Sequence, residues 1–425
     1  MLDGPGGGAA VCHRSATTAL ADRRYRDPMS SDTDAARVAE LAHTVVAEHD
    51  PKQVPVVEFL GACYDAGLSW VNFPEGLGGM GLSRGLQAVA DKILQGAGGP
   101  VPLGLNPMGY GMAAPTVCEH AQTEDLKKFF LRPLATTEDI WCQLFSEPGA
   151  GSDLAGLATS AIPDGDEWVV NGQKVWTSLA HRARWGLLLA RTDPDAPKHR
   201  GLTYFVLDMH SPGVECRPLR QMTGQAEFNE VYITDARIPD AHRLGAVGDG
   251  WRVAMTTLMN ERSALGGSGN RRGSGTISEA VELWAARPDL HTPVLRDRLT
   301  QLWLRSEAQR LTSERSRTTA TAGSPGPEGS IGKMVGAELN QHIYEFCMDL
   351  LGPEGILYHS YALHGANDDD DWRGPIQQRY LRSRANTIEG GTSEVMRNIL
   401  GERVLGLPGD LRADAGMPWK DVPRG

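Results

Sequence analysis

The sequence has no run of about 18 consecutive apolar residues, the minimum for a membrane-spanning helix, and its N-terminus lacks the charged start and apolar stretch of a secretory signal. Its six cysteines are scattered, with no Cys-X-X-Cys pair and no histidine at metal-ligand spacing. These absences predict a reduced, cytoplasmic protein without a membrane span or a structural metal.

Positive charge is also scarce. The chain carries 42 lysines and arginines against 53 aspartates and glutamates, which gives a formal net charge of −11. A surface of this sign repels polyanions, so we expect no nucleic-acid partner. A single CoA molecule is not excluded, because a few arginines and helix N-termini can bind a phosphate locally.

At 425 residues the chain is long enough for two or three packed units. Apolar residues at three-to-four spacing, as in Ala35–Ala42 and Pro55–Leu60, predict helices near the N-terminus, and long helical patterns return after a β-rich stretch. We therefore predict a mixed, mainly α fold. Its expected parts are a disordered leader (1–31, in which Met29 could be the true start), an N-terminal helical domain (32–140), a middle antiparallel β domain (141–250), a C-terminal helical bundle (251–408) and a tail (409–425).

The clearest strand pattern runs through Glu167–Val170 and, after a turn at Asn171-Gly172, through Lys174–Trp176, because an Asn-Gly pair supplies the positive φ of a tight hairpin. Further strands are expected at 185–191, 202–208 and 230–233, and loops at 321–329 and at the glycine-rich segment 73–81. A phosphate cradle is the alternative for the glycine-rich segment, but no Lys-Ser/Thr follows it.

Three separate patterns carry the candidate chemistry. The first joins Gln143–Asp153 to Gln173–Ser178, where small residues let a polar cofactor approach the backbone and Trp176 offers a flat apolar face. A flavin fits that description, whereas a lone tryptophan in a strand is more often a core residue. The second pattern is Thr257–Ser263, and the third is Asn386–Arg397, a Gly-Gly turn that leads into a helix with Thr392 as its expected cap.

Taken together, four of these motifs resemble the acyl-CoA dehydrogenase family, in its actinobacterial style, from about residue 32 to 408. The motifs are Glu147–Asp153, Asn171–Lys174, Trp176 and Gly391–Glu394. The resemblance implies an FAD-dependent oxidoreductase of lipid and fatty acid metabolism, as in β-oxidation, that converts an acyl-CoA to the trans-2-enoyl-CoA. It also implies an electron-transfer flavoprotein as acceptor and FAD bound between the middle domain and a neighbouring subunit, in a homodimer, homotetramer or heterotetramer.

The resemblance assigns roles by position. In family members a carboxylate removes the α-proton while the β-hydrogen leaves as hydride to flavin N5. The backbone N–H of Gly390 is expected to bind the thioester oxygen, Ser152 to meet the CoA moiety and Arg262 to orient the thioester. The residues expected to bind FAD are Gln143, Phe145, Ser146, Trp176, Ser178, Gly352, Gly355, Thr392 and Glu394.

The position of the base departs from the commonest family pattern. Many members place the carboxylate directly before Gly-Thr, where this chain has Gly390, and Glu389 lies one residue too early. Isovaleryl and long-chain types present the base from a helix, at the position that Glu261 occupies. We therefore predict Glu261 as the base, with Glu389 as runner-up. The alternative for Glu261 is a solvated helix glutamate beside Arg262.

One family segment has no counterpart in this sequence. The Arg-X-X-Phe-Gly segment that reaches the FAD pyrophosphate of a neighbouring subunit is missing between residues 266 and 299, and Arg287 lies in roughly that region. The resemblance also fits an acyl-CoA oxidase, a flavin monooxygenase-like relative, or a non-catalytic partner subunit of a heterotetramer. Residues 99–115 are candidates for the acyl end of the pocket, and short, branched, long and sterol-derived acyl chains are all open as substrates.

Overall fold

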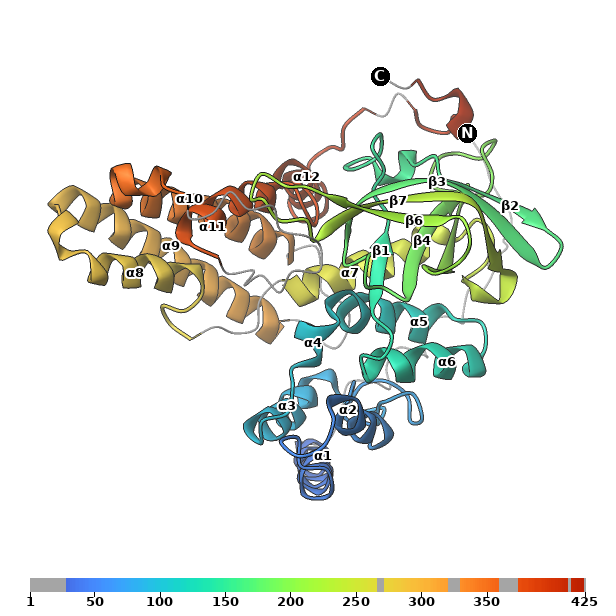
Figure 1. The fold of residues 1–425 in the computed structure, drawn as a ribbon, viewed down its shortest axis with the longest axis horizontal. Coiled ribbons are helices and arrows are strands. Elements are labelled where there is room, and N and C mark those ends of the chain that lie inside the picture. The colour runs from blue at the N-terminus through green and yellow to red at the C-terminus, as the bar shows by residue number, and fades with distance from the viewer. Residues whose placement is uncertain (1–27, 266–270, 320–328, 359–373, 412–413, 424–425) are drawn as a thin grey trace, which may run out of the picture. The chain divides into compact units, whose positions relative to one another are not determined.

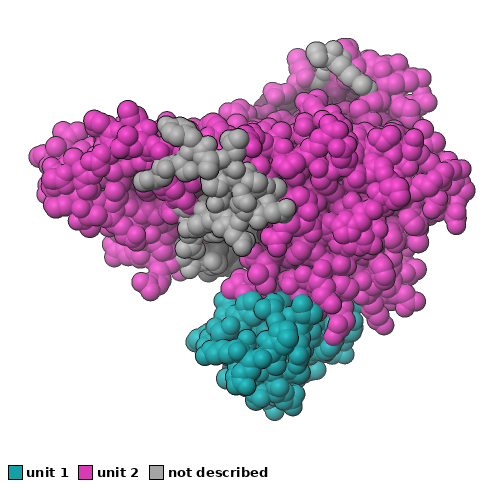
Figure 2. Space-filling model, viewed as in Figure 1, with its two compact units in different colours: residues 1–100 teal, residues 101–425 magenta. Residues whose placement is uncertain are grey.

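The computed structural model describes residues 28–265, 271–319, 329–358, 374–411 and 414–423. Residues 1–27 of the expected leader and 321–328 of the expected loop lie outside these ranges. Two compact units make up the chain, residues 1–100 and 101–425 (Figure 2). No helix within the described ranges is both long and apolar enough to cross a bilayer.

The first unit is helical, as the apolar spacing predicts. Val38 and Ala42, one helical turn apart, are both fully buried and pack with Phe59 and Leu60. The glycine-rich segment forms the expected tight loop, in which a Cβ on Gly79 would lie 2.1 Å from the Phe73 carbonyl oxygen. The helices of this unit are α1 (Pro28–Glu48), α2 (Val56–Asp65) and α3 (Gln87–Gly96), preceded at α3 by a short 3-10 turn (Arg84–Leu86).

The second unit begins with short helices. They are α4 (Pro102–Leu105), a π-helical turn (Gly109–Ala113), α5 (Ala114–His120) and α6 (Glu124–Ala135). The buried Asn106 donates a hydrogen bond to the Asp139 carbonyl, 3.0 Å away, and accepts one from the Trp141 amide, 3.2 Å away. This side chain therefore ties the helices to the first strand of the sheet.

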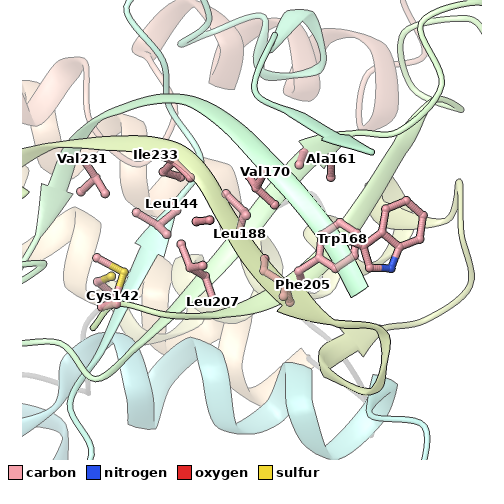
Figure 3. Close-up of a cluster of buried hydrophobic side chains, with 14 of the residues drawn as sticks. Cys142, Leu144, Ala161, Trp168, Val170, Leu188, Phe205, Leu207, Val231 and Ile233 are labelled. Atoms are coloured by element: carbon pink, nitrogen blue, oxygen red, sulfur yellow. The ribbon is translucent and has the colours of Figure 1, made fainter. Parts of the chain in front are cut away.

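The middle of the chain forms one sheet in the order β6-β7-β3-β2-β4-β5-β8, with β1 paired to β4 (Figure 1). Most neighbours are antiparallel, as predicted, but β1 and β2 each pair with β4 in parallel. Figure 3 shows part of the core, in which Leu144, Leu188, Phe205 and Leu207 are fully buried. The strands are β1 (Trp141–Leu144), β2 (Ser160–Asp164), β3 (Glu167–Ser178), β4 (Trp185–Arg191), β5 (Leu202–Asp208), β6 (Val214–Leu219), β7 (Phe228–Pro239) and β8 (Arg243–Leu244).

The predicted hairpin at Asn171-Gly172 is wrong. Strand β3 continues through this pair with a shift in its register against β7, and Asn171 lies opposite Ser160 on β2 while Gly172 lies opposite Ile233 on β7. The glycine is needed for a close approach rather than a turn, because a Cβ on Gly172 would lie 2.3 Å from the Thr159 hydroxyl oxygen. The β2–β3 hairpin turns instead before Glu167, where Gly165 has a φ of +67°.

The C-terminal part is again helical, which confirms the mixed, mainly α fold. Figure 1 shows α8–α11 gathered in one bundle beside the sheet. Its buried core includes Ile277, Leu302, Ile343 and Phe346. The helices are α7 (Gly250–Leu265), α8 (Thr276–Ala286), α9 (Pro293–Thr319), α10 (Gly329–Leu351), α11 (Ile376–Ser383) and α12 (Ser393–Arg403), with 3-10 turns at Pro288–Leu290, Gly352–Ile356 and Arg384–Thr387.

The described end of the chain, residues 414–423, packs on the sheet. The Trp419 indole N–H donates to the Gly156 carbonyl over 3.1 Å, and the Arg191 guanidinium lies over the indole ring, 4.4 Å from its centroid. Lys198 forms ion pairs with both Asp153 and Asp414. Lys198 and Gly156 therefore join this segment to one end of the loop that the sequence associates with CoA.

Candidate active site

A buried ion pair fixes the loop that follows β1. The Lys174 ammonium, fully buried on β3, donates to a Glu147 carboxylate oxygen over 2.8 Å and to the carbonyls of Phe145 and Leu189 over 3.1 and 2.9 Å. The same carboxylate accepts the amides of Ala158 and Thr159. Together these bonds join the β1 loop to strands β3 and β4.

The electrostatics of the pair follow from its burial. Desolvation raises the pKa of Glu147, but the Lys174 charge and the hydrogen bonds from Lys174, Thr159 and Ala158 outweigh it and hold that pKa below its ordinary value. Burial lowers the pKa of Lys174, although Glu147 opposes that shift. We take the pair as ionised, because each charged group is surrounded by hydrogen-bonding partners of the matching kind.

The end of β3 presents Trp176 outward. Its φ of +60° is unusual for a tryptophan, it sits at a bulge between Lys174 and Thr177, and 58% of its surface is exposed. The adjacent Val175 amide donates to the Ser146 carbonyl over 2.9 Å, so the β1 loop lies beside this bulge. The core-residue alternative for Trp176 is therefore wrong.

Several polar groups around this bulge are available to a cofactor. The Thr177 hydroxyl is buried without a hydrogen-bond partner among the described residues. Gln143, Ser146 and Ser178 are partly exposed, and their side chains bond to nothing within the same ranges. An exposed aromatic face next to unpaired amide and hydroxyl groups fits the ring and polar edge of a flavin. Phe145 differs, because its ring is buried against Tyr204.

Glu261 lies on helix α7, which buried hydrogen bonds hold in position. The buried Thr257 hydroxyl lies 2.9 Å from both the Thr116 hydroxyl of α5 and the Tyr204 hydroxyl of β5. The neighbouring Thr256 hydroxyl lies 2.9 Å from the His120 ring nitrogen. Because Glu261 follows Thr257 by one helical turn, these buried bonds hold the helix face that carries the carboxylate.

The Gly-Gly turn forms where the sequence predicts it. Gly390 and Gly391 have φ values of +60° and +93°, which favour glycine. Thr392 caps α12 as expected, since its hydroxyl accepts the Val395 amide over 3.1 Å, and Glu394 lies in the first helical turn. The Gly390 amide donates to no group among the described residues and is therefore available to a ligand.

Glu389 is held by its neighbours. Arg382 donates to both of its carboxylate oxygens, over 3.1 and 2.8 Å, and the Asn386 amide donates to one of them over 2.8 Å. The Arg382 guanidinium also lies 5.7 Å from the Phe228 ring centroid, and that ring packs edge-on against Trp176 at 6.1 Å. This series of contacts brings the end of β3 and the Gly-Gly turn to one region.

Sequence reasoning missed Lys333, on α10. Its ammonium donates to the carbonyls of Asn386, over 2.9 Å, and Gly391. Burial lowers the pKa of Lys333, while the nearby Glu389, Glu261 and Glu394 carboxylates raise it. One local signal existed: no acidic residue lies three or four positions away on either side, so a helical partner for this charge is missing.

The remaining predicted residues are placed elsewhere or not described. Ser152 lies in an exposed loop, and the Arg262 side chain is outside the described part. Gly352 and Gly355 lie in the 3-10 turn after α10. Within that turn Glu354 pairs with Arg287, which also binds Asp289, so Arg287 is engaged inside this chain. The FAD and CoA roles of these residues stay predictions.

Comparison with protein families points to one group. The middle-domain model of acyl-CoA dehydrogenases matches residues 142–236, and the C-terminal-domain model matches residues 248–405. Acyl-CoA dehydrogenase IpdE1 of Mycobacterium tuberculosis is 39% identical over 347 residues, which cover 82% of this chain and 86% of that protein. Acyl-CoA dehydrogenase FadE34 of the same organism is 42% identical over 298 residues, 70% of this chain, but the chain spans only 39% of its length.

Solved structures agree on the fold. A steroid ACAD, Tcur3481-Tcur3483, superposes with a TM-score of 0.67 at 26% identity, covering 91% of this chain and 99% of that one. The ChsE4-ChsE5 complex from Mycobacterium tuberculosis gives a TM-score of 0.66 at 26% identity, covering 91% and 100%.

Proposed function

Since the chain belongs to the acyl-CoA dehydrogenase family, and is thus an FAD-dependent oxidoreductase, we propose that it dehydrogenates an acyl-CoA between Cα and Cβ with Glu261 as the base. The product is the trans-2-enoyl-CoA. FAD, when bound, takes up the hydride that leaves the β-carbon. The other steps fall to side chains and amides of this chain.

The position of Glu261 on α7 is the observation that carries the choice of base. Buried hydrogen bonds of Thr257 fix this helix one turn before Glu261. Glu389, the runner-up, would have to give up bonds to Arg382 and Asn386 before it accepted a proton. A base must be held at the right place, and α7 provides that.

The reaction also requires a hydrogen-bond donor to the thioester oxygen, and the Gly390 amide would supply it. When the α-proton leaves, negative charge develops on the thioester oxygen, and a donor aimed at that oxygen stabilises it. An unpaired amide in a turn of fixed geometry meets this need. On the cofactor side, Trp176 would cover the flavin ring, while Gln143, Ser146 and Ser178 would bind its polar edge.

Substrate, acceptor and assembly belong to the same proposal. The π-helical turn Gly109–Ala113 lies in the segment expected at the acyl end, and such turns are frequent at functional sites. The acyl-CoAs to be tested include steroid-derived ones, because one solved relative is a steroid ACAD.

We further propose an electron-transfer flavoprotein as the electron acceptor and a homo- or heterotetramer as the assembly. We also propose a cytoplasmic location. Free thiols support this location, and they are those of Cys63, Cys118, Cys142, Cys216 and Cys347.

The test is product analysis with an artificial electron acceptor. The purified holoprotein is incubated with short, long, branched and steroid-derived acyl-CoAs, and the products are identified by mass. We expect one class to lose two hydrogens, and Glu261→Gln to slow that reaction by about 10³-fold. Glu282→Gln, on the exposed face of α8, is the control and should match the unmodified protein. A holoprotein that oxidises none of these thioesters would refute the function, and activity that survives in Glu261→Gln but vanishes in Glu389→Gln would refute the choice of base.

A further inference from the structure

Lys333 bonds to both ends of one turn. Its ammonium donates to the Asn386 carbonyl at the start of the turn and to the Gly391 carbonyl at its end. Within the turn, the amides of Ile388 and Glu389 both bond to the Ala385 carbonyl, over 2.8 and 2.9 Å. Glu389 is the last residue whose amide bonds to the Ala385 carbonyl. The two glycines that follow it are held by the Lys333 side chain, which comes from α10.

The turn depends on such support. Gly390 and Gly391 both adopt positive φ, and glycine has more conformational freedom to lose than any other residue. The Gly390 amide, which the proposed function directs at the thioester oxygen, makes no bond of its own among the described residues. Its direction is therefore set by the backbone on either side, including the Gly391 carbonyl that Lys333 binds.

We propose that Lys333 is a positioning residue that fixes the Gly390–Gly391 turn. The use of this turn in the reaction rests on the proposed function, whereas the positioning role itself does not. A side chain without an ammonium group at position 333 loses both carbonyl bonds and loosens the turn. An arginine keeps the charge but reaches the two carbonyls with a different geometry.

Amide hydrogen exchange tests the turn without reference to activity. In Lys333→Met we expect the amides of Ile388, Glu389 and Val395 to exchange at least about tenfold faster, while those in the middle of α10 keep their protection. Glu338→Gln is the matched control, because it removes a different α10–α12 ion pair, with Arg397, and leaves the turn untouched. Unchanged exchange around the turn in Lys333→Met would overturn the positioning role, even if no acyl-CoA is oxidised.

Steady-state kinetics test what the turn does in the reaction. Lys333→Met and Lys333→Arg should both lower kcat more than they raise KM, because the Gly390 amide is directed at an oxygen that becomes charged only as the reaction proceeds. A KM that rises while kcat stays unchanged would overturn this use of the turn. An unmodified enzyme that dehydrogenates nothing would instead refute the proposed function, and the exchange result would still decide the turn.

Discussion

Lys174 and Lys333 are buried or half-buried lysines that make similar hydrogen bonds but have different roles. Lys174 lies fully inside the sheet region, where one carboxylate and two carbonyls surround its ammonium. Lys333 lies among the C-terminal helices and also binds two carbonyls, both of them in the Gly-Gly turn. A lysine matched to one buried carboxylate stabilises the fold, whereas a lysine that binds the carbonyls of a turn can also position a group that takes part in the reaction.

The largest expected effect is a loss of stability when Lys174 is replaced. Lys174→Met leaves the Glu147 carboxylate buried without its counter-ion, which should lower the free energy of unfolding by about 3–5 kcal/mol. Chemical denaturation measures the change. Adding Glu147→Met should recover much of the loss, because no uncompensated charge then remains.

Arg237→Met is the matched control for this prediction, since its ion pairs with Asp164 and Glu167 are exposed and should contribute less than about 1 kcal/mol. A loss in Lys174→Met no larger than that in Arg237→Met would contradict a structural role for the buried pair.

A glycine beside each lysine sharpens the comparison. Gly172→Ala pushes a Cβ against Thr159 and should cost about 1–3 kcal/mol of stability, measured by thermal unfolding. Gly391→Ala meets the flexible end of Met396 at a φ of +93°, so we expect its main effect on the rate of dehydrogenation through the turn. Gly96→Ala has open space around it and should change neither quantity. Equal losses of stability in the first two variants would remove the distinction between the regions.

The smallest effect is acid sensitivity. The folded pKa of Glu147 lies below its unfolded value, so its contribution to stability is fully present above the ordinary carboxyl range, about pH 4.3, and is lost as pH falls through the folded pKa. Denaturation midpoints between about pH 6 and 3 measure this loss. Glu147→Gln should lower the slope of unfolding free energy against pH in this range by roughly 1 kcal/mol per pH unit, and an unchanged slope would show that Glu147 does not titrate with unfolding.

The sequence predicted the local features well. Strands β4 and β5 match their predicted ranges, because continuous apolar runs suit strands covered on both sides. The cap at Thr392 and the Gly-Gly turn were also confirmed, since each depends on residues adjacent in the chain.

Features that depend on residues far away in the sequence could not be predicted from local patterns. Asn171-Gly172 carries the same local signal for a hairpin as for a strand that passes close to Thr159, and only the neighbours β2 and β7 decide between them. Lys333 binds carbonyls more than 50 positions away, and nothing in its own helix specifies them.

The most direct test of Glu261 as the base follows the proton alone. The holoprotein is incubated in heavy water with an acyl-CoA in which sulfur replaces the β-carbon, so that no hydride can leave, and deuterium at the α-carbon is measured. The unmodified protein and Glu389→Gln should incorporate deuterium, and Glu261→Gln should not. Incorporation that persists in Glu261→Gln, or that disappears only in Glu389→Gln, would contradict the account.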